Sequence, residues 1–155
     1  MTTKPLIIQL EDDMNDVFLF DRAFKKAQVA AELVSFQDSE HFITSLNERE
    51  KVQTNESPLP SLVLLDIKLP RKSGFEVLEW MRTHPVFKRI PVVMLTSSAQ
   101  PGDVRRAYDL GANGYLVKPM DIDQMIRLLG SVQDFWVHAN VTALTPDERA
   151  TAAAR

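Results

Sequence analysis

The sequence contains no cysteine. Disulfide bonds, thiolate nucleophiles and zinc sites with sulfur ligands are therefore excluded. Long hydrophobic runs are also missing. The apolar stretch from Leu6 to Leu10 is too short for the core of a signal peptide, and no segment approaches the length of a membrane span. We therefore expect no membrane association and a cytoplasmic location.

An excess of positive charge is absent as well. The chain carries 18 Lys and Arg against 21 Asp and Glu, a formal net charge of −3. A nucleic-acid-binding domain is expected to be strongly basic, so nucleic acid is not an expected partner. The 155 residues, 45% of them hydrophobic, suit one globular domain with a sizeable core. We expect that domain over residues 1–140 and a flexible tail over 141–155.

Apolar runs of strand length alternate with stretches of helical period along the chain. The expected strands cover residues 6–10, 33–36, 62–65, 92–95 and 115–117. The expected helices cover residues 16–28, 39–49, a segment after Gly74 that includes 77–81, 103–110, and 122–137. Five strands alternating with five helices predict an α/β fold with a five-stranded parallel sheet covered on both faces, and doubly wound topologies are the commonest of this kind.

Polar residues follow the apolar strands at the point where each strand ends. They are Glu11-Asp12-Asp13 after the first strand, Asp66 after the third, Thr96-Ser97-Ser98 after the fourth and Lys118-Pro119 after the fifth. In doubly wound sheets, ligands bind beyond the carboxyl ends of the strands. We therefore expect these groups to converge on one edge of the sheet.

Several carboxylates at one edge repel each other by roughly 4 kcal/mol per pair at 4 Å and an effective dielectric constant of 20. Protonation of one carboxyl or a bound cation relieves that repulsion. Oxygen ligands with room for water suit magnesium, which is commonly held by one or two carboxylates together with phosphate. A carboxylate such as Asp66 can accept a phosphoryl group. Lys118 and the Thr96 hydroxyl are then suited to contact its oxygens.

Each of these residues also has a purely structural interpretation. An aspartate that ends a strand is most often a turn or capping residue, and Asp13 or Asn15 is expected to cap the first helix. His41, His84 and His138 are isolated in the sequence and are expected at the surface. Only the combination of acid, acceptor, hydroxyl and amine at four strand ends favours phosphotransfer.

The sequence resembles the receiver domains of two-component response regulators over about residues 5 to 138. The resemblance is carried by residues 7–13, residues 64–70 with Gly74, residues 95–97 and residues 111–119. It implies a flavodoxin-like fold with strand order 2-1-3-4-5. The loop before the third strand, Pro-Arg-Lys after Asp66 and Asp-Phe-Trp near the end resemble more narrowly the stand-alone regulators paired with bacterial and cyanobacterial phytochromes.

The resemblance implies a role for each residue of the metal site. Asp66 is the phosphoacceptor for a sensor histidine kinase, a bacteriophytochrome in the narrower resemblance. Asp12 binds Mg²⁺ directly and Glu11 binds it through water, with Asp66 and the backbone carbonyl of Lys68 as further ligands. Many relatives carry Asn where Lys68 stands, which leaves the rate of dephosphorylation open.

The resemblance also implies a conformational switch. Thr96 bonds the phosphoryl group, Lys118 pairs with it, and Tyr115 changes rotamer. We expect no DNA-binding output domain after residue 140, so the output is expected to be contact with a downstream protein target.

Two other functions, a phosphatase and a nucleotide-binding domain, each require residues that can be looked for in the sequence. An aspartate-nucleophile phosphatase of the haloacid-dehalogenase type needs a second acid two residues after the nucleophile, and that position holds Lys68. A nucleotide-binding domain needs a Gly-rich turn after the first strand, where this chain has Glu11-Asp12-Asp13-Met14. An adaptor with a receiver fold that works without phosphorylation remains open.

The last expected helix carries two apolar strips. One faces the sheet, and Leu128 and Phe135 fall away from it. We expect these two residues to form the interface of a two-fold homodimer. The alternative is that the tail covers them with Val141 and Leu144.

Overall fold

The computed structural model describes residues 4–52 and 57–143 of the chain. Its strands are β1 (Leu6–Leu10), β2 (Glu32–Phe36), β3 (Leu62–Leu65), β4 (Val92–Thr96) and β5 (Gly114–Val117). Its α-helices are α1 (Met14–Lys26), α2 (Ser39–Val52), α3 (Gly74–Thr83), α4 (Pro101–Asp109) and α5 (Ile122–Val132). A 3₁₀ turn, η1 (Phe87–Arg89), follows α3, and a π-helical segment, η2 (Gln133–Ala139), follows α5. The order and type of the predicted elements are confirmed.

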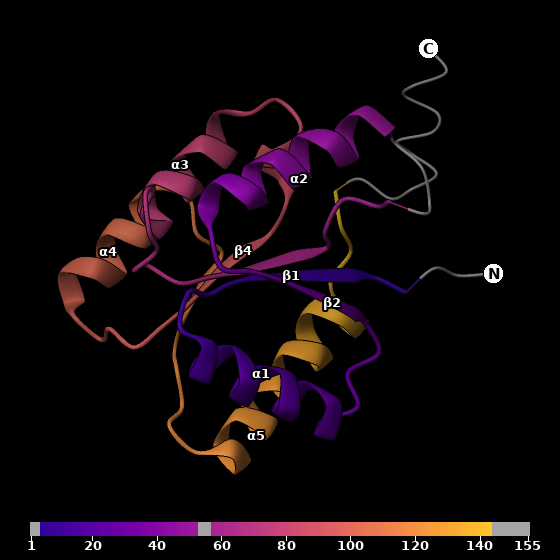
Figure 1. Ribbon diagram of the computed structural model, residues 1–155, viewed down its shortest axis with the longest axis vertical. Helices are drawn as coiled ribbons and strands as arrows, with labels where there is room; N and C mark the ends of the chain where they lie inside the picture. Colours follow the sequence, from indigo (N-terminus) through magenta and orange to yellow (C-terminus); the bar gives the residue numbers. More distant parts are fainter. Residues whose placement is uncertain (1–3, 53–56, 144–155) are drawn as a thin grey trace.

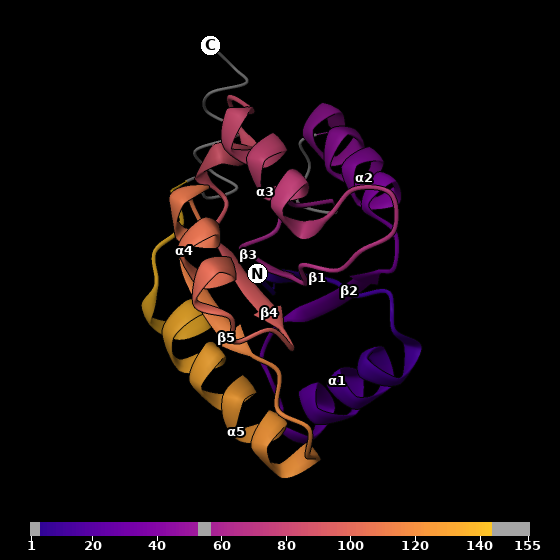
Figure 2. The ribbon, with the colours of Figure 1, turned by 90° about the vertical axis from the view of Figure 1, so that its left-hand side faces the viewer.

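All neighbouring strands pair in parallel, in the order β2-β1-β3-β4-β5. This confirms the doubly wound fold that the resemblance implied. Helices α2, α3 and α4 lie on one face of the sheet and α1 and α5 on the other (Figures 1 and 2). The carboxyl ends of the strands therefore meet at one edge, between the two helical layers.

Each face of the sheet has its own core, because alternate strand residues point to opposite faces. Ile8, Leu10 and the α2–α4 helices build one core, around the fully buried Phe42 and Phe87. Ile7 and the helices α1 and α5 build the other. Strands buried on both faces are built mainly from apolar residues, which explains the unbroken apolar run of β3 and the four apolar residues of β1, where the buried Gln9 accepts a hydrogen bond from Ser35. The edge strands β2 and β5 are partly exposed.

Capping residues decide where the helices begin. Asp13 accepts hydrogen bonds from the Asn15 and Asp16 amides, so α1 begins at Met14, two residues earlier than predicted. This confirms Asp13 as the cap. Pro101 occupies the first turn of α4, where a missing N–H is harmless, and α4 begins two residues before the predicted Asp103.

The predicted last helix over 122–137 is present, but its type changes: it is α-helical to Val132 and π-helical from Gln133 to Ala139. Two expectations about side chains are wrong. His84 is not a surface residue: its Nδ1 accepts hydrogen bonds from the Val86 and Phe87 amides, and its ring stacks on Phe87. Leu128 does not fall away from the core, because the helical turn packs it against the α1–α5 core.

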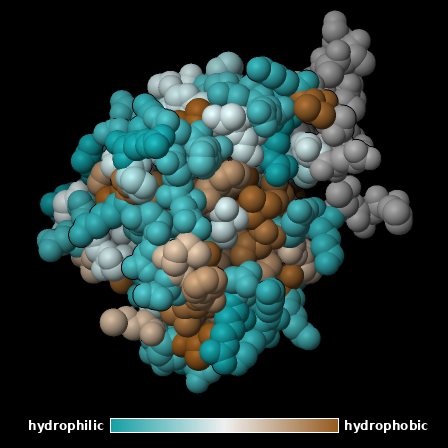
Figure 3. All heavy atoms as spheres, in the orientation of Figure 1, coloured by the Kyte–Doolittle hydropathy of each residue, from teal (hydrophilic) through white to brown (hydrophobic). Residues whose placement is uncertain are grey.

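Figure 3 shows hydrophilic side chains over most of the helices and apolar side chains at the surface between the two helical layers. Within the described ranges, no helix is long and apolar enough to cross a membrane. Val141 is 85% exposed, so it does not cover α5. Leu144 and most of the predicted tail lie outside the described residues.

Candidate functional site

The site lies where β1 and β3 end side by side. Asp66 follows the last residue of β3, and its amide donates to the Leu10 carbonyl of β1 at 3.2 Å. That backbone bond brings Asp66 next to Glu11, the first residue after β1. Both residues are buried, at 6% and 1% exposure, whereas Asp12 is exposed. The predicted convergence of the strand ends is therefore present in the structure.

Glu11, Asp12 and Asp66 form a cluster that could hold a metal ion. One carboxylate oxygen from each residue lies within 4.8 Å of the others. The Glu11 Oε2 atom is buried and has no hydrogen-bond partner among the described residues. A buried carboxylate oxygen without a partner is costly, and a hard divalent cation satisfies it. The donor set therefore fits Mg²⁺.

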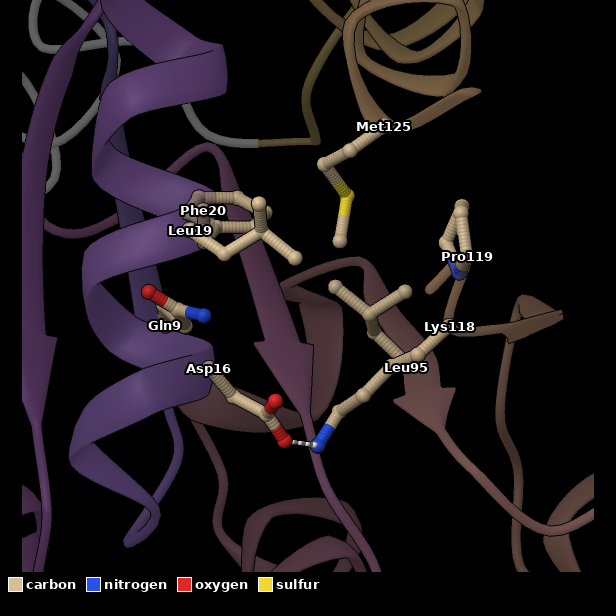
Figure 4. A pocket seen from close by; sticks show the side chains of 8 residues that line it. All are labelled: Gln9, Asp16, Leu19, Phe20, Leu95, Lys118, Pro119 and Met125. Atoms are coloured by element: carbon tan, nitrogen blue, oxygen red, sulfur yellow. Dashed lines mark hydrogen bonds and ion pairs between the residues drawn. The ribbon is translucent and has the colours of Figure 1, made fainter. Parts of the chain in front are cut away.

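Lys118, at the end of β5, reaches into the same cluster. Its ammonium donates to Asp66 Oδ2 at 2.8 Å, to Asp16 Oδ2 at 3.1 Å, and to Glu11 Oε1. Figure 4 shows the contact with Asp16, which extends from the first turn of α1. The Lys118 side chain is 11% exposed, so water screens these interactions weakly.

Glu11, Asp66 and Lys118 differ in the direction in which the site shifts their pKa values and in their protonation. Burial, together with Asp66, raises the pKa of the Glu11 carboxyl to about 9, against the effect of Lys118. Burial also acts to raise the pKa of Asp66, but its hydrogen bonds with Glu11 and Lys118 outweigh burial and hold the pKa below its ordinary value. Burial acts to lower the pKa of Lys118, and the bonds to Asp66 and Glu11 raise it further than burial lowers it. The metal-free site therefore pairs a protonated Glu11 with an ionised Asp66 and a charged Lys118 at neutral pH.

Thr96 and Tyr115 lie on the neighbouring strands β4 and β5. Thr96 is the buried last residue of β4, and its carbonyl accepts from the Lys118 amide at 2.8 Å. The Tyr115 hydroxyl donates to the Ser98 carbonyl at 2.9 Å, and the Ser98 hydroxyl donates to Asp103 at 2.6 Å. These bonds connect β5 to the loop after β4 and to the start of α4.

The loop after Asp66 is held by the first turn of α2. The buried Ser39 hydroxyl donates to the Pro70 carbonyl and accepts from the Lys72 amide, each at 3.3 Å. Arg71 pairs with Glu40 at 2.7 Å. Lys68 is exposed in this loop and lines a shallow groove together with Asp12.

The predicted site residues on the strand ends therefore come together, and the two predicted interface residues lie apart from them. Phe135 is 56% exposed, whereas Leu128 is half-buried. Asp16 joins the site through its contact with Lys118, although no strand-end argument identified it. The sequence feature that could have identified Asp16 is its position three residues after the cap Asp13, in the turn of α1 nearest the strand ends.

The comparisons with known proteins all point to the same family. A family model described as the response regulator receiver domain matches residues 7–130. The response regulator Rcp1 of Synechocystis sp. is 33% identical over 132 residues, which cover 85% of this chain and 88% of Rcp1. A crystal structure of the Mn²⁺-bound form of Rcp1 superposes with a TM-score of 0.77 at 31% identity, over 90% of this chain and 99% of that one.

Two further solved structures are similar. The phosphorylated cyanobacterial phytochrome response regulator RcpA is 30% identical, with a TM-score of 0.79 over 91% of this chain and 99% of RcpA. The bacteriophytochrome response regulator RtBRR is 33% identical, with a TM-score of 0.70 over 99% of this chain and 90% of RtBRR. The resemblance stated from the sequence, including its narrower form, is confirmed.

Proposed function

The chain belongs to the response regulator receiver-domain family, and we propose that it accepts a phosphoryl group on Asp66 from the phosphohistidine of a sensor histidine kinase. One observation carries the proposal: the ionised Asp66 carboxylate lies 2.8 Å from the Lys118 ammonium, beside the Glu11 oxygen that has no partner among the described residues. An Asp66 carboxylate oxygen forms the new P–O bond while the P–N bond to imidazole breaks, and the imidazole nitrogen keeps the electron pair.

The remaining residues have roles that follow from charge. Mg²⁺ held by Glu11, Asp12, Asp66 and the Lys68 carbonyl would offset the negative charge of the incoming phosphoryl group. Lys118 is within reach of Asp66 and is suited to pair with the phosphoryl oxygens once Asp66 is phosphorylated.

The same chemistry supports a switch at β5. Thr96 is the last residue of β4, and in this proposal its hydroxyl donates to the phosphoryl group. A move of the loop after β4 towards that group breaks the bond between Tyr115 and Ser98 and frees the tyrosine to change rotamer. The surface formed by α4, β5 and α5 would then bind a downstream protein target differently in the two states.

The proposed phosphoryl donor is inferred from two similar proteins. RcpA is described as a phytochrome response regulator and RtBRR as a bacteriophytochrome response regulator. We therefore propose a phytochrome-type sensor histidine kinase as the phosphoryl donor. A cytoplasmic location belongs to the same proposal, because the ATP that charges such a kinase is found there.

Self-association is the second part of the proposed function. Phe135 is a large aromatic side chain that is 56% exposed, and it packs edge-on against Trp136 at a ring distance of 4.7 Å. An aromatic side chain held in place by a neighbour is a low-entropy contact for a partner. We place Phe135 at the centre of a two-fold homodimer interface and the half-buried Leu128 at its edge.

The test is phosphorylation by a small donor. Incubation with acetyl phosphate and Mg²⁺ should add one phosphoryl group, detected by mass spectrometry, and Asp66→Asn should abolish the addition because an amide is a poor nucleophile. Asp21→Asn, which removes an exposed carboxylate of α1, is the matched control and should be phosphorylated normally. Addition to the Asp66→Asn variant would assign the acceptor elsewhere. A wild type that takes up no phosphoryl group would favour the phosphorylation-independent adaptor.

A further inference from the structure

Lys118 has three partners, and they belong to two groups. An ammonium has three protons to donate, and here they point to Glu11, Asp66 and Asp16. Glu11 and Asp66 belong to the three-carboxylate cluster that could hold a metal ion. Asp16 does not belong to it. In the part of the chain that the structure describes, Asp16 is thus the one ammonium partner of Lys118 outside the metal cluster.

A cation in the cluster and the Lys118 ammonium compete for the same two carboxylates. Both are positively charged, so they also repel each other. For Glu11 and Asp66 to become metal ligands, Lys118 must give up part of its contact with them. We propose that Asp16 is the alternative partner of the ammonium, and that by holding it on the α1 side it makes Glu11 and Asp66 available to Mg²⁺. The inference rests on the proposed function and adds a positioning residue to it.

The surroundings of the contact support this role. The Asp16 amide is bonded to the cap Asp13, which fixes the first turn of α1 against the strand ends. Lys118 lines a small cavity together with Asp16 and the apolar side chains of Leu95 and Met125 (Figure 4). Low polarity beside the Lys118 side chain strengthens an ion pair at its end. The Asp16 carboxylate itself is 45% exposed, so it can hold the ammonium without burying a further charge.

The alternative role for Asp16 is structural. An acidic residue in the first turn of a helix interacts favourably with the helix dipole. That role predicts a small loss of stability in Asp16→Asn but no dependence of metal affinity on Lys118. Metal affinity measured with and without Lys118 therefore separates the two roles, whereas stability does not.

The experiment is a double-mutant cycle read out by calorimetric Mg²⁺ titration of the full chain. Asp16→Asn should weaken Mg²⁺ binding about three-fold in the wild-type background, the effect of one partly exposed ion pair. In a Lys118→Met background, which keeps the apolar stem and removes the ammonium, Asp16→Asn should have no effect. Asp21→Asn is the matched control, because it removes the same charge from α1 next to Lys25, and it should leave Mg²⁺ affinity unchanged.

The outcomes of this experiment distinguish a failure of the inference from a failure of the proposed function. An equal loss of affinity in both backgrounds would mean that Asp16 acts on the metal by its own charge, and unchanged affinity in the wild-type background would mean that it does not act at all. Either result overturns the inference and leaves the proposed phosphotransfer intact. A wild type that binds Mg²⁺ as expected but takes no phosphoryl group refutes the proposed function alone. A wild type that binds no Mg²⁺ would refute the metal site, on which both the inference and the proposed function depend.

Discussion

Gly74 faces the carbonyl oxygen of Asp66 so closely that a Cβ on Gly74 would overlap that oxygen. The Gly74 amide also donates to the Ile67 carbonyl at 2.8 Å, which ties the start of α3 to the residue after the acceptor. The position of the acceptor therefore depends on a missing side chain at the beginning of the next helix.

Replacing Gly74 should damage the fold and the site together. In Gly74→Ala the backbone of Asp66 has to move, and overpacking of this kind costs about 1–3 kcal/mol. We expect that loss of unfolding free energy in urea denaturation, together with slower phosphorylation by acetyl phosphate. Gly102→Ala is the control, because a Cβ there has nothing within 4 Å, and it should be neutral or stabilising. A fully stable and fully active Gly74→Ala variant would contradict the packing argument.

The adjacent residues Asp12 and Asp13 should respond in opposite ways. Asp12 is exposed and belongs to the metal cluster, so Asp12→Ala should weaken Mg²⁺ binding and leave metal-free stability equal or higher. Asp13 caps α1, so Asp13→Ala should cost about 1 kcal/mol of stability and affect Mg²⁺ binding less. Calorimetric Mg²⁺ titration and metal-free urea denaturation of both variants measure the two effects. A marked loss of metal-free stability in Asp12→Ala would instead identify Asp12 as a structural residue.

Glu11 should make metal-free stability fall as pH rises. Its carboxyl has a pKa of about 9 in the folded protein against an ordinary 4.5, so between these values the folded state binds the proton more tightly than the unfolded state. The slope is at most about 1.4 kcal/mol per pH unit for one proton.

Its neighbours titrate outside that range. The lowered pKa of Asp66 contributes stability that is lost only in acid, and the raised pKa of Lys118 contributes stability that is lost only in strong alkali. Urea denaturation in EDTA at about pH 6 and about pH 8 should show the fall, and Glu11→Gln should remove it. An equal fall in Glu11→Gln would assign the pH dependence to another group.

The proposed dimer is testable by sedimentation at micromolar concentration. The wild type should sediment as a dimer, and the Leu128→Glu, Phe135→Glu double variant as a monomer, because two charges would be buried at each contact. Phe18→Glu is the control: Phe18 is 64% exposed on α1 and is not one of the two proposed interface residues, and its replacement should leave the dimer intact. A wild type that is monomeric with and without acetyl phosphate would contradict the proposal.

The strands and the acidic part of the site were predictable for one physical reason. A strand buried on both faces is built mainly from apolar residues, so its end is visible in the sequence where the apolar run gives way to polar residues. That is why Leu65 followed by Asp66 marks both the end of β3 and a candidate acceptor. Helix ends were less predictable, because a cap such as Asp13 acts through its hydrogen bonds and not through hydrophobic period.

Sequence alone thus determined the element order, the edge of the sheet that carries the chemistry, and the residue types gathered there. Tertiary structure decided which of those groups touch. Lys118 and Asp16 are 102 residues apart, and their contact depends on how α1 packs beside the end of β5. Leu128 likewise packs on the core because of the orientation of α5. Periodicity fixes the face on which a residue lies, but the neighbour that it meets is set by packing between elements distant in the chain.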